Sequence, residues 1–404
     1  MLAARSVAIP SGCIGTIAGN GEPGHTGDNG SAVGACLNEP KSLALSAGGI
    51  LYIADAENHV IRKVDLASGL ITTVAGHPEK DDGASRPAPA HAPAPAEDED
   101  PLADPPAGKA EKFVQLSDVS GTVRYVVGAG KSGRFGGDGG SASQATLNFP
   151  GAVAVDGRGN LYIADTMNHR VRKVDAATGI ITTVAGTGQH RCSGDGGPAI
   201  AAALNEPAAL AVDGRGNLYI ADQSNNRVRK VDAATGIITT VAGTGETGYT
   251  GDGMSATEAG VSGPSGLTLG PDGDLYIADT FSGRIRRVDP ATGIISTVAG
   301  DGGEYRFSGL PNEFSTSLSR PYGIALDAAG NLLITDSDSH LIRRWDRKKK
   351  IITRLAGSGQ AQFGGDGGDP LAGSLNYPFG VLVDGAGNVY IADTFNHRIR
   401  MIAV

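Results

Sequence analysis

Charged residues with a fixed spacing are the first candidates for chemistry in this chain. An Asp is followed seven residues later by an Arg in six pairs, Asp55/Arg62, Asp165/Arg172, Asp222/Arg229, Asp279/Arg286, Asp336/Arg343 and Asp393/Arg400. A carboxylate can act as a general acid or base, and a guanidinium can bind an anion. A catalytic site is normally used once, however, whereas a device present six times serves the repeat itself. We therefore predict structural pairs that satisfy buried polar groups.

Four histidines share one position in the same repeat, four residues after the Asp. They are His59, His169, His340 and His397, with Asn226 and Gly283 in the two other copies. Imidazole is a frequent metal ligand, so a shared metal ion is one hypothesis for this set. The answer depends on how far apart the fold places these residues.

An aromatic residue, a small residue, Gly and Asp form a third recurring pattern. Its clearest copies are Phe135 to Asp138, Tyr249 to Asp252 and Phe363 to Asp366; His25 to Asp28 and Cys192 to Asp195 replace the aromatic residue, and Phe307 to Leu310 loses the Asp. In one interpretation the aromatic residue pins a loop and Asp-Gly forms a turn. In the other, aromatic platforms and acidic groups bind a sugar or Ca²⁺. No copy supplies the six or more oxygens that Ca²⁺ takes, so we predict no cofactor and keep Ca²⁺ as the alternative.

The elements that must position these residues follow from a repeat of 57 residues (222 minus 165, for example). The Asp of YIAD, or of LITD in one copy, recurs at this interval from Asp165 onward, whereas Asp55 and Asp165 are 110 residues apart. Residues 152–186 contain four short runs, AVAVD, LYIAD, VRKVD and IITTVAG, which we name strands A to D. The polar and Gly-rich turns between them are typical of antiparallel hairpins. Four such strands repeated around an axis form the blades of a β-propeller.

The string YIADTMNHRVRKVD resembles the NHL repeat, named after its Asn-His-Leu turn. The loops AGTGETGYTGDG and FGGDGG resemble the long-repeat members of that family in bacterial surface proteins and in the teneurin propeller. The resemblance covers nearly the whole chain, and it implies an all-β fold, a six-bladed β-propeller of four-stranded antiparallel blades. Family members include adhesion modules, sensor domains, RNA-binding domains and a few lyases, so the fold alone does not select a function.

The two ends of the chain are expected to close the ring. The chain ends in RIRMIAV, which matches strand C, and residues 13–19 (CIGTIAG) match the missing strand D. We predict that this N-terminal strand closes the C-terminal blade, which gives six complete blades in a single propeller spanning residues 1–404. We expect the ring to be monomeric.

An insertion between residues 77 and 130 accounts for an excess of 53 residues, 110 minus 57. Residues 78–110 are rich in Pro, Ala and acidic residues, which predicts a disordered or extended segment. Residues 111–128 resemble a strand C to strand D hairpin with no preceding strands. They form either an extra β-hairpin or the remnant of a seventh blade, and we favour the hairpin because a blade needs four strands.

The propeller interpretation argues against a metal ion shared by the histidines. The B-to-C turns lie two strand spacings outside strand A, roughly 10 Å further from the axis. Equivalent turns on different blades are then too far apart for one ion with bonds of ~2 Å. We therefore predict no metal site and assign the histidines to turn hydrogen bonding.

A ligand is expected on the face that carries the long D-to-A loops and the B-to-C turns, because loops on a rigid scaffold commonly bind. The candidate ligand-binding residues are Phe135, Asp138, Tyr249, Asp252, Tyr305, Arg306, Phe307, Phe363 and Asp366. Departures from the repeat favour the sector of loops 246–258 and 302–316. Near it in sequence are the altered turn at 281–283 and the single Trp, Trp345.

Two classes of function compete for this scaffold. The first is a non-catalytic binding or scaffold propeller that recognises a protein, peptide or glycan. The alternative is a propeller enzyme, a lyase or lactonase-like hydrolase with an axial site, and a purely structural module is a third interpretation. An axial catalyst needs ligands at the start of strand A, where the chain has Lys41, Gly151, Ala208, Ser265, Tyr322 and Phe379. No GxSxG, HExxH or phosphate-loop motif is present, so we favour binding and leave the enzyme open.

Composition limits the partners of the chain. The net charge of -9 makes nucleic acid an unfavourable partner, so we assign the basic run at 347–350 to a solvated turn. No apolar stretch is long enough to span a bilayer. Three cysteines at no metal-ligand spacing argue against a disulfide framework. We recognise no signal peptide, which fits either a cytoplasmic location or secretion with the signal removed.

Overall fold

The computed structural model describes residues 8–77, 116–117, 123–124, 135–303 and 316–404. The chain divides into two units, residues 1–78 with 134–404, and residues 79–133. In the second unit, β7 (Leu116–Ser117) pairs antiparallel with β8 (Val123–Arg124). The predicted disordered segment at 78–110 lies outside the described residues, and the extra hairpin at 111–128 stays a prediction beyond these two short strands.

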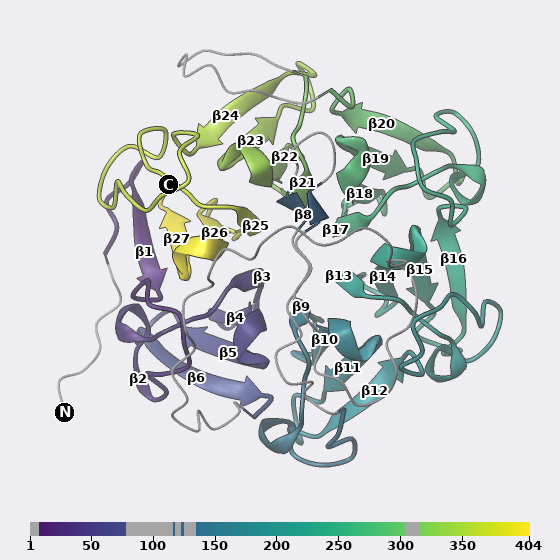
Figure 1. Ribbon diagram of the computed structural model, residues 1–404, viewed down its shortest axis with the longest axis horizontal. Coiled ribbons are helices and arrows are strands. Elements are labelled where there is room, and N and C mark those ends of the chain that lie inside the picture. The colour runs from purple at the N-terminus through teal and green to yellow at the C-terminus, as the bar shows by residue number, and fades with distance from the viewer. Residues whose placement is uncertain (1–7, 78–115, 118–122, 125–134, 304–315) are drawn as a thin grey trace, which may run out of the picture. The chain divides into compact units, whose positions relative to one another are not determined.

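Six antiparallel sheets surround a common axis in the first unit, so the predicted six-bladed propeller is confirmed (Figure 1). Blade 1 contains β3 (Pro40–Leu45), β4 (Ile50–Asp55), β5 (Val60–Asp65) and β6 (Leu70–Ala75), with β2 (Gly30–Ser31) added to β6. Blade 2 contains β9 (Pro150–Val155), β10 (Leu161–Asp165), β11 (Arg170–Val174) and β12 (Ile181–Ala185). Blade 3 contains β13 (Pro207–Val212), β14 (Leu218–Asp222), β15 (Arg227–Val231) and β16 (Ile238–Ala242).

Blades 4 to 6 repeat this order from the innermost strand A to the outermost strand D. Blade 4 contains β17 (Pro264–Leu269), β18 (Leu275–Asp279), β19 (Arg284–Val288) and β20 (Ile295–Ala299). Blade 5 contains β21 (Pro321–Leu326), β22 (Leu332–Asp336), β23 (Leu341–Trp345) and β24 (Ile352–Ala356). Blade 6 contains β25 (Pro378–Val383), β26 (Val389–Asp393), β27 (Arg398–Ile402) and β1 (Ile14–Ala18).

The N-terminal strand closes the ring, as predicted. β1 pairs antiparallel with β27, with Ile14 opposite Ile402 and Gly15 opposite Met401. Ile14 and Ala18 have no exposed surface, and Ile14 packs with Ile391 in the apolar core between blades 5 and 6. The first and last strands of the propeller are therefore held together by both backbone pairing and core packing.

The register of strand A places an important pair of residues side by side. In blade 2, the register shifts by one residue after Ala164, so that Asp165 at the end of β10 lies opposite Pro150. Proline has no N–H for a strand ladder, which suits the first position of an inner strand. The shift recurs in every blade and brings the strand-B Asp beside the start of strand A in all six.

The long D-to-A loops line the outer edge of the blade that they enter. In the loop before blade 2, Ser141 forms a β-bridge with Ile180, and the Ala142 N–H donates to the Gly179 carbonyl in the C-to-D turn. We expected these loops on one face from the sequence. Instead, each of these loops runs along strand D, to which it is hydrogen-bonded, toward the face of the C-to-D turns. The chain then returns to the start of strand A.

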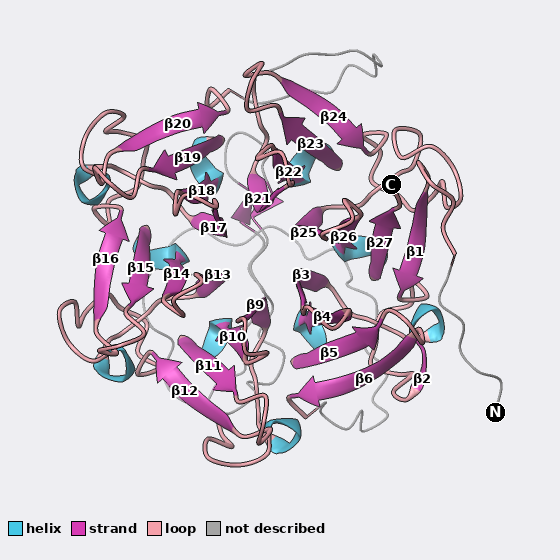
Figure 2. Cartoon of the chain, turned by 180° about the vertical axis from the view of Figure 1, so that it is seen from behind, coloured by secondary structure: helices cyan, strands magenta, loops and turns pink. Residues whose placement is uncertain are grey.

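One-turn 3-10 helices occur at two places in the repeat. Those of the long loops are η1 (Ala32–Gly34), η3 (Ala142–Gln144), η5 (Ala199–Ala201) and η7 (Ala256–Glu258). Those after strand B are η2 (Ala56–Asn58), η4 (Thr166–Asn168), η6 (Gln223–Asn225), η8 (Thr280–Ser282), η9 (Ser337–Ser339) and η10 (Thr394–Asn396). Figure 2 shows the first set at the outer edge of the ring and the second set nearer the axis.

Ring closure predicts that deleting residues 1–20 destroys cooperative unfolding. The deletion removes the fourth strand of blade 6 and exposes apolar surface that Ile14 now covers. Thermal unfolding followed by circular dichroism measures the effect, and deletion of residues 1–7 alone is the control because it leaves β1 intact. An unchanged melting transition after the longer deletion would refute the closure.

Candidate functional site

A fully buried arginine lies at the centre of each blade. In blade 2, Arg172 Nη1 lies 3.3 Å from Asp165 Oδ2 at the end of strand B. Its Nη2 lies 2.7 Å from Asp138 Oδ1 in the long loop. Arg172 and Asp165 have no exposed side-chain surface, whereas Asp138 is 35% exposed. One guanidinium therefore joins strand B, strand C and the loop of its own blade.

The other blades repeat this arrangement. The same double pairing joins Arg62 to Asp55 and Asp28, Arg229 to Asp222 and Asp195, Arg286 to Asp279 and Asp252, and Arg400 to Asp393 and Asp366, and Arg343 pairs with Asp336.

The strand-B Asp organises the turn that follows it. Asp165 Oδ1 accepts a hydrogen bond of 2.7 Å from the Asn148 N–H, and its Oδ2 accepts one of 2.9 Å from Asn168. Burial raises the pKa of Asp165 to about 6, although these hydrogen bonds and Arg172 act to lower it. The Asn of the Asn-His turn therefore has a defined role, because it satisfies a carboxylate that water does not reach.

The loop residues predicted to bind a ligand contact the same arginines. The Phe135 ring centroid lies 4.0 Å from Cζ of Arg170 and 4.7 Å from Cζ of Arg172. Tyr249 stacks in the same way on Arg284 and Arg286, and Phe363 on Arg398 and Arg400. All three rings stay about 40% exposed. They hold the loop on the blade, and their contact with a ligand stays a prediction; Tyr305, Arg306 and Phe307 lie outside the described residues.

The histidines join neighbouring blades. The Phe149 N–H, just before strand A of blade 2, donates a hydrogen bond of 2.9 Å to Nδ1 of His59 in blade 1. We call this bond the interblade latch. Phe149 has a φ of 50°, a left-handed conformation that few residues with a side chain adopt, and its N–H meets His59 from that conformation. The predicted role within the turn therefore becomes a role between blades.

The latch recurs at four further seams. His397 accepts from Glu39, His169 from Glu206 and His340 from Tyr377 through Nδ1, and Asn226 accepts from Gly263 through its side-chain oxygen. The seam between blades 4 and 5 has Gly283 in the acceptor position, so the described residues form no latch to Arg320 there.

Three positions of each blade lie near the propeller axis on the face of the B-to-C turns. They are the residues before and after the strand-A Pro and the second residue of the 3-10 helix after strand B. In blade order the residues are Glu39, Lys41 and Glu57; Phe149, Gly151 and Met167; Glu206, Ala208 and Ser224; Gly263, Ser265 and Phe281; Arg320, Tyr322 and Asp338; and Tyr377, Phe379 and Phe395. We call this set the axial end. No two blades carry the same three residues.

Aromatic residues and one cation form an arc across part of the axial end. The Tyr322 and Phe379 ring centroids are 4.4 Å apart, and Phe395 lies 6.0 Å from Phe379. Lys41 Nζ lies 4.7 Å from the Phe379 centroid and 4.5 Å from the Phe149 centroid. Blades 5, 6, 1 and 2 therefore contribute to one aromatic arc centred on Lys41.

Polar contacts occur in blades 3 and 4 of the axial end, beside the exposed ring of Phe281. Ser224 donates to Glu206 at 2.5 Å, and Gln223, beside the axial residues, donates to Ser265 at 2.6 Å. From the sequence we had considered the residue after Pro only as a catalytic ligand. The signal that could have identified the axial end is variation among the repeats. The axial residues differ from blade to blade, whereas the strand-A Pro, the strand-B Asp and the strand-C Arg are the same in all six.

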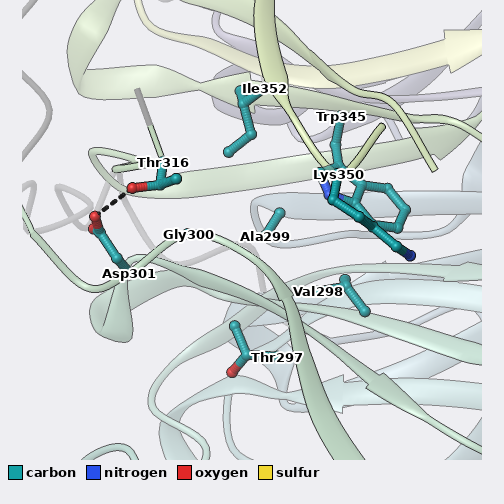
Figure 3. Close-up of a pocket in the computed structure, with 9 residues that line it drawn as sticks. All are labelled: Thr297, Val298, Ala299, Gly300, Asp301, Thr316, Trp345, Lys350 and Ile352. Carbon is teal, nitrogen blue, oxygen red and sulfur yellow. Dashed lines mark hydrogen bonds between the residues drawn. The ribbon is translucent and has the colours of Figure 1, made fainter. Parts of the chain in front are cut away.

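A cavity of about 290 Å³ lies between blades 4 and 5, and of the described residues in the predicted loops 246–258 and 302–316, Thr316 alone lines it (Figure 3). Trp345, Ile352 and Lys350 line it from blade 5, and the Thr316 hydroxyl donates to Asp301 at 2.6 Å along its border. Residues 304–315, which connect Asp301 to Thr316 along the chain, lie outside the described part. We therefore assign no ligand to this cavity.

Other site classes receive no support from the described residues. No three His, Cys, Asp or Glu residues among them are grouped so that they could hold a metal ion. Within the same residues, no helix has the length and apolar character needed to cross a membrane.

Six antiparallel blades, each centred on a buried Arg and joined at five seams by the interblade latch, define a β-propeller of the NHL type. The family model for the teneurin NHL domain matches residues 6–98, 110–193 and 187–250. The chain belongs to this family of NHL propellers.

Curated relatives share a large part of the chain. The protein SUPPRESSOR OF QUENCHING 1, chloroplastic, of Arabidopsis thaliana is 32% identical over 290 residues, which cover 69% of this chain and 27% of that protein. NHL repeat-containing protein 2 of Gallus gallus is 29% identical over 312 residues, or 70% of this chain and 42% of the relative. The chain thus spans less than half the length of these relatives.

Solved structures share the fold at low identity. A Bacteroides thetaiotaomicron protein of unknown function superposes with a TM-score of 0.61 at 17% identity, over 96% of this chain and 74% of that one. An auxiliary nutrient binding protein from the same species superposes with a TM-score of 0.59 at 14% identity, over 96% of this chain and 75% of that one. A Xanthomonas campestris gluconolactonase superposes with a TM-score of 0.52 at 14% identity, over 99% of this chain and 91% of that one.

The buried guanidinium predicts a strong effect of one substitution. Arg172→Met leaves Asp165 buried without its cation, and we expect a loss of about 3–5 kcal/mol in the free energy of unfolding. Arg158→Met, in an exposed turn, is the control and should change it by less than about 0.5 kcal/mol. Urea unfolding measures both variants. Equal effects of the two substitutions would show that the buried pair does not organise the blade.

The latches predict a stability that depends on pH. Burial lowers the pKa of His169, His340 and His397 below the usual 6.5, so the unfolded chain binds more protons there than the folded ring. Their contribution is present above pH 6.5 and is lost as the pH falls through the folded pKa. Asn at these three His positions keeps an acceptor, as Asn226 does, but cannot titrate. Between about pH 7 and pH 5, we expect the free energy of unfolding to fall further in the wild type than in this variant, by about 1 kcal/mol for each substituted latch.

The comparison between the two proteins isolates the histidines. The raised pKa of the buried Asp residues acts in the opposite direction, since the folded state then holds more protons as the pH falls toward 4. Both proteins contain these residues, so their effect cancels. Identical pH dependence of urea unfolding in the wild type and the Asn variant would contradict the latch.

Proposed function

We propose that this chain is a non-catalytic binding propeller that recognises a protein, peptide or glycan on the face of the B-to-C turns, through the axial end. One observation carries the proposal. The residue after the strand-A Pro is a different type in each of the six blades, whereas that Pro, the strand-B Asp and the strand-C Arg are the same in all six. A specific ligand needs an asymmetric surface, and a repeated ring offers one only where its blades differ.

Packing at the axial end is adapted to its varied residues. A Cβ on Gly263 would lie 2.2 Å from the Phe281 ring, so the small residue accompanies the large one. Arg320 pairs with Asp338 at 3.6 Å, whereas Glu206 receives the Ser224 hydroxyl at the equivalent positions of blade 3. Residues that vary together in contact support a selected surface over random drift of the repeats.

The long-loop residues stay candidate ligand contacts apart from the axial end, because the long loops line the outer edge of the blades. Phe135, Tyr249 and Phe363 are each about 40% exposed, although an arginine stacks on each ring. The alternative of a lyase or lactonase-like enzyme rests on likeness of fold, which does not select a chemistry.

The proposal predicts that axial substitutions abolish binding without unfolding the ring. We would screen the full chain against a peptide display library and a glycan array, and then test each ligand with Phe281→Ser combined with Phe395→Ser. We expect binding to fall at least about tenfold, since central aromatic anchors dominate interfaces. Ile200→Ser, on the outer loop, is the matched control, because Ile200 is 62% and Phe281 59% exposed.

Several outcomes would refute the axial assignment. Full binding by the axial double variant would do so, as would loss of binding through Phe135→Ala and Tyr249→Ala alone. Loss of all binding after deletion of residues 78–110 alone would place recognition in the insertion. Melting curves of each variant show whether the ring is still folded.

A further inference from the structure

The Lys41 ammonium group has no hydrogen-bond acceptor within the described part of the chain. Its Nζ lies over the Phe149 and Phe379 rings, at 4.5 and 4.7 Å from their centroids, and it forms no hydrogen bond or ion pair with the described residues. An ammonium group has three N–H donors, and a ring face satisfies none of them fully. Lys41 is also the one charged residue among the six that follow the strand-A Pro.

The surroundings of Lys41 make its charge costly. Burial lowers the pKa of Lys41, and the carboxylates of Glu39 and Glu57 oppose this effect. Neither carboxylate forms an ion pair with the Lys41 ammonium, so they offset its charge without meeting its donors. A partner that supplies an oxygen anion at contact distance would form a short, charge-assisted hydrogen bond.

The neighbouring rings describe the rest of such a partner. Tyr322 continues the arc from Phe379, and both Tyr322 and Phe395 keep part of their surface exposed. An aromatic or aliphatic group beside the anion could pack on these rings and remove apolar surface from water. The chain carries a net charge of -9, so attraction at long range is weak and recognition depends on contact.

Resting on the function proposed above, we propose that the axial end binds a carboxylate through Lys41, with an aromatic or aliphatic group of the same ligand packed on Tyr322 and Phe395. A free organic acid and the C-terminus of a peptide both have this chemistry. Lys41 then acts as an anchoring residue that selects ligands by charge, and the arc selects them by shape.

A matched pair of probes tests this inference on the full chain. N-acetylphenylalanine and N-acetylphenylalaninamide differ in the carboxylate alone, and titrations followed by NMR measure the two dissociation constants. We expect the acid to bind at least about tenfold more tightly than the amide, with a dissociation constant near the millimolar range. A peptide that ends in a free Phe carboxylate, compared with its amidated form, distinguishes the peptide source from the free acid.

Variants locate the preference. Lys41→Met should bind acid and amide equally, because it keeps the length of the side chain and removes its charge. Lys41→Arg should restore part of the preference, and Lys348→Met, at an exposed turn, should leave it unchanged. Unchanged binding of the amide by Lys41→Met shows that the aromatic arc is intact.

Three results would overturn the inference: equal binding of acid and amide to the wild type, binding of neither probe, or a preference that survives Lys41→Met. If one of these occurs while the Phe281 and Phe395 variants still abolish recognition of a screened ligand, only the role of Lys41 fails. If those variants also bind normally, the proposed function fails with it.

Discussion

The buried guanidinium of strand C is the interaction on which the rest of the structure depends. A charge removed from water must find partners, because an isolated buried cation costs far more than the few kcal/mol that stabilise a domain. Arg172 meets this demand with Asp165 from strand B and Asp138 from the long loop. The pairing thereby fixes the strand register, the turn after strand B and the entry of the loop. Its repetition allows one short sequence pattern to specify each blade.

Much of this fold can be predicted from the sequence, because residues that recur in all six copies are the ones that the blade structure requires. The strand order, the closure by residues 13–19 and the Asp–Arg spacing all follow from local patterns. The course of the loops does not, since short apolar residues such as Ala142 give no sign that they cover the neighbouring strand D. The acceptor role of His59 is equally hidden, because its donor at Phe149 lies 90 residues away in the chain. The insertion at 77–130 hides this further, since it separates two blades that are adjacent in space.

The candidate site was harder to predict for a related physical reason. Motif searches look for residues that a chemistry requires, whereas a binding surface is marked by positions that the fold leaves free. Strand pairing, the Pro position and the buried Arg constrain every blade equally, and the axial end lies beyond all three. Under the proposed function, its variation from Lys41 to Phe379 serves ligand contacts that are made once per molecule. The turn at 281–283 also departs from the repeat. Gly283 has no side chain to form the latch, and Phe281 beside it is exposed.

The central claim is that the fold does not require the axial residues but recognition does. The most direct test gives blade 5 the axial residues of blade 3, through Arg320→Glu, Tyr322→Ala and Asp338→Ser together. The melting temperature and the affinity for a screened ligand are then measured on the same protein. We predict a melting temperature within a few degrees of the wild-type value, a change of the size that surface substitutions cause, together with loss of ligand binding. A large drop in melting temperature, or unchanged affinity in a folded ring, would contradict this account.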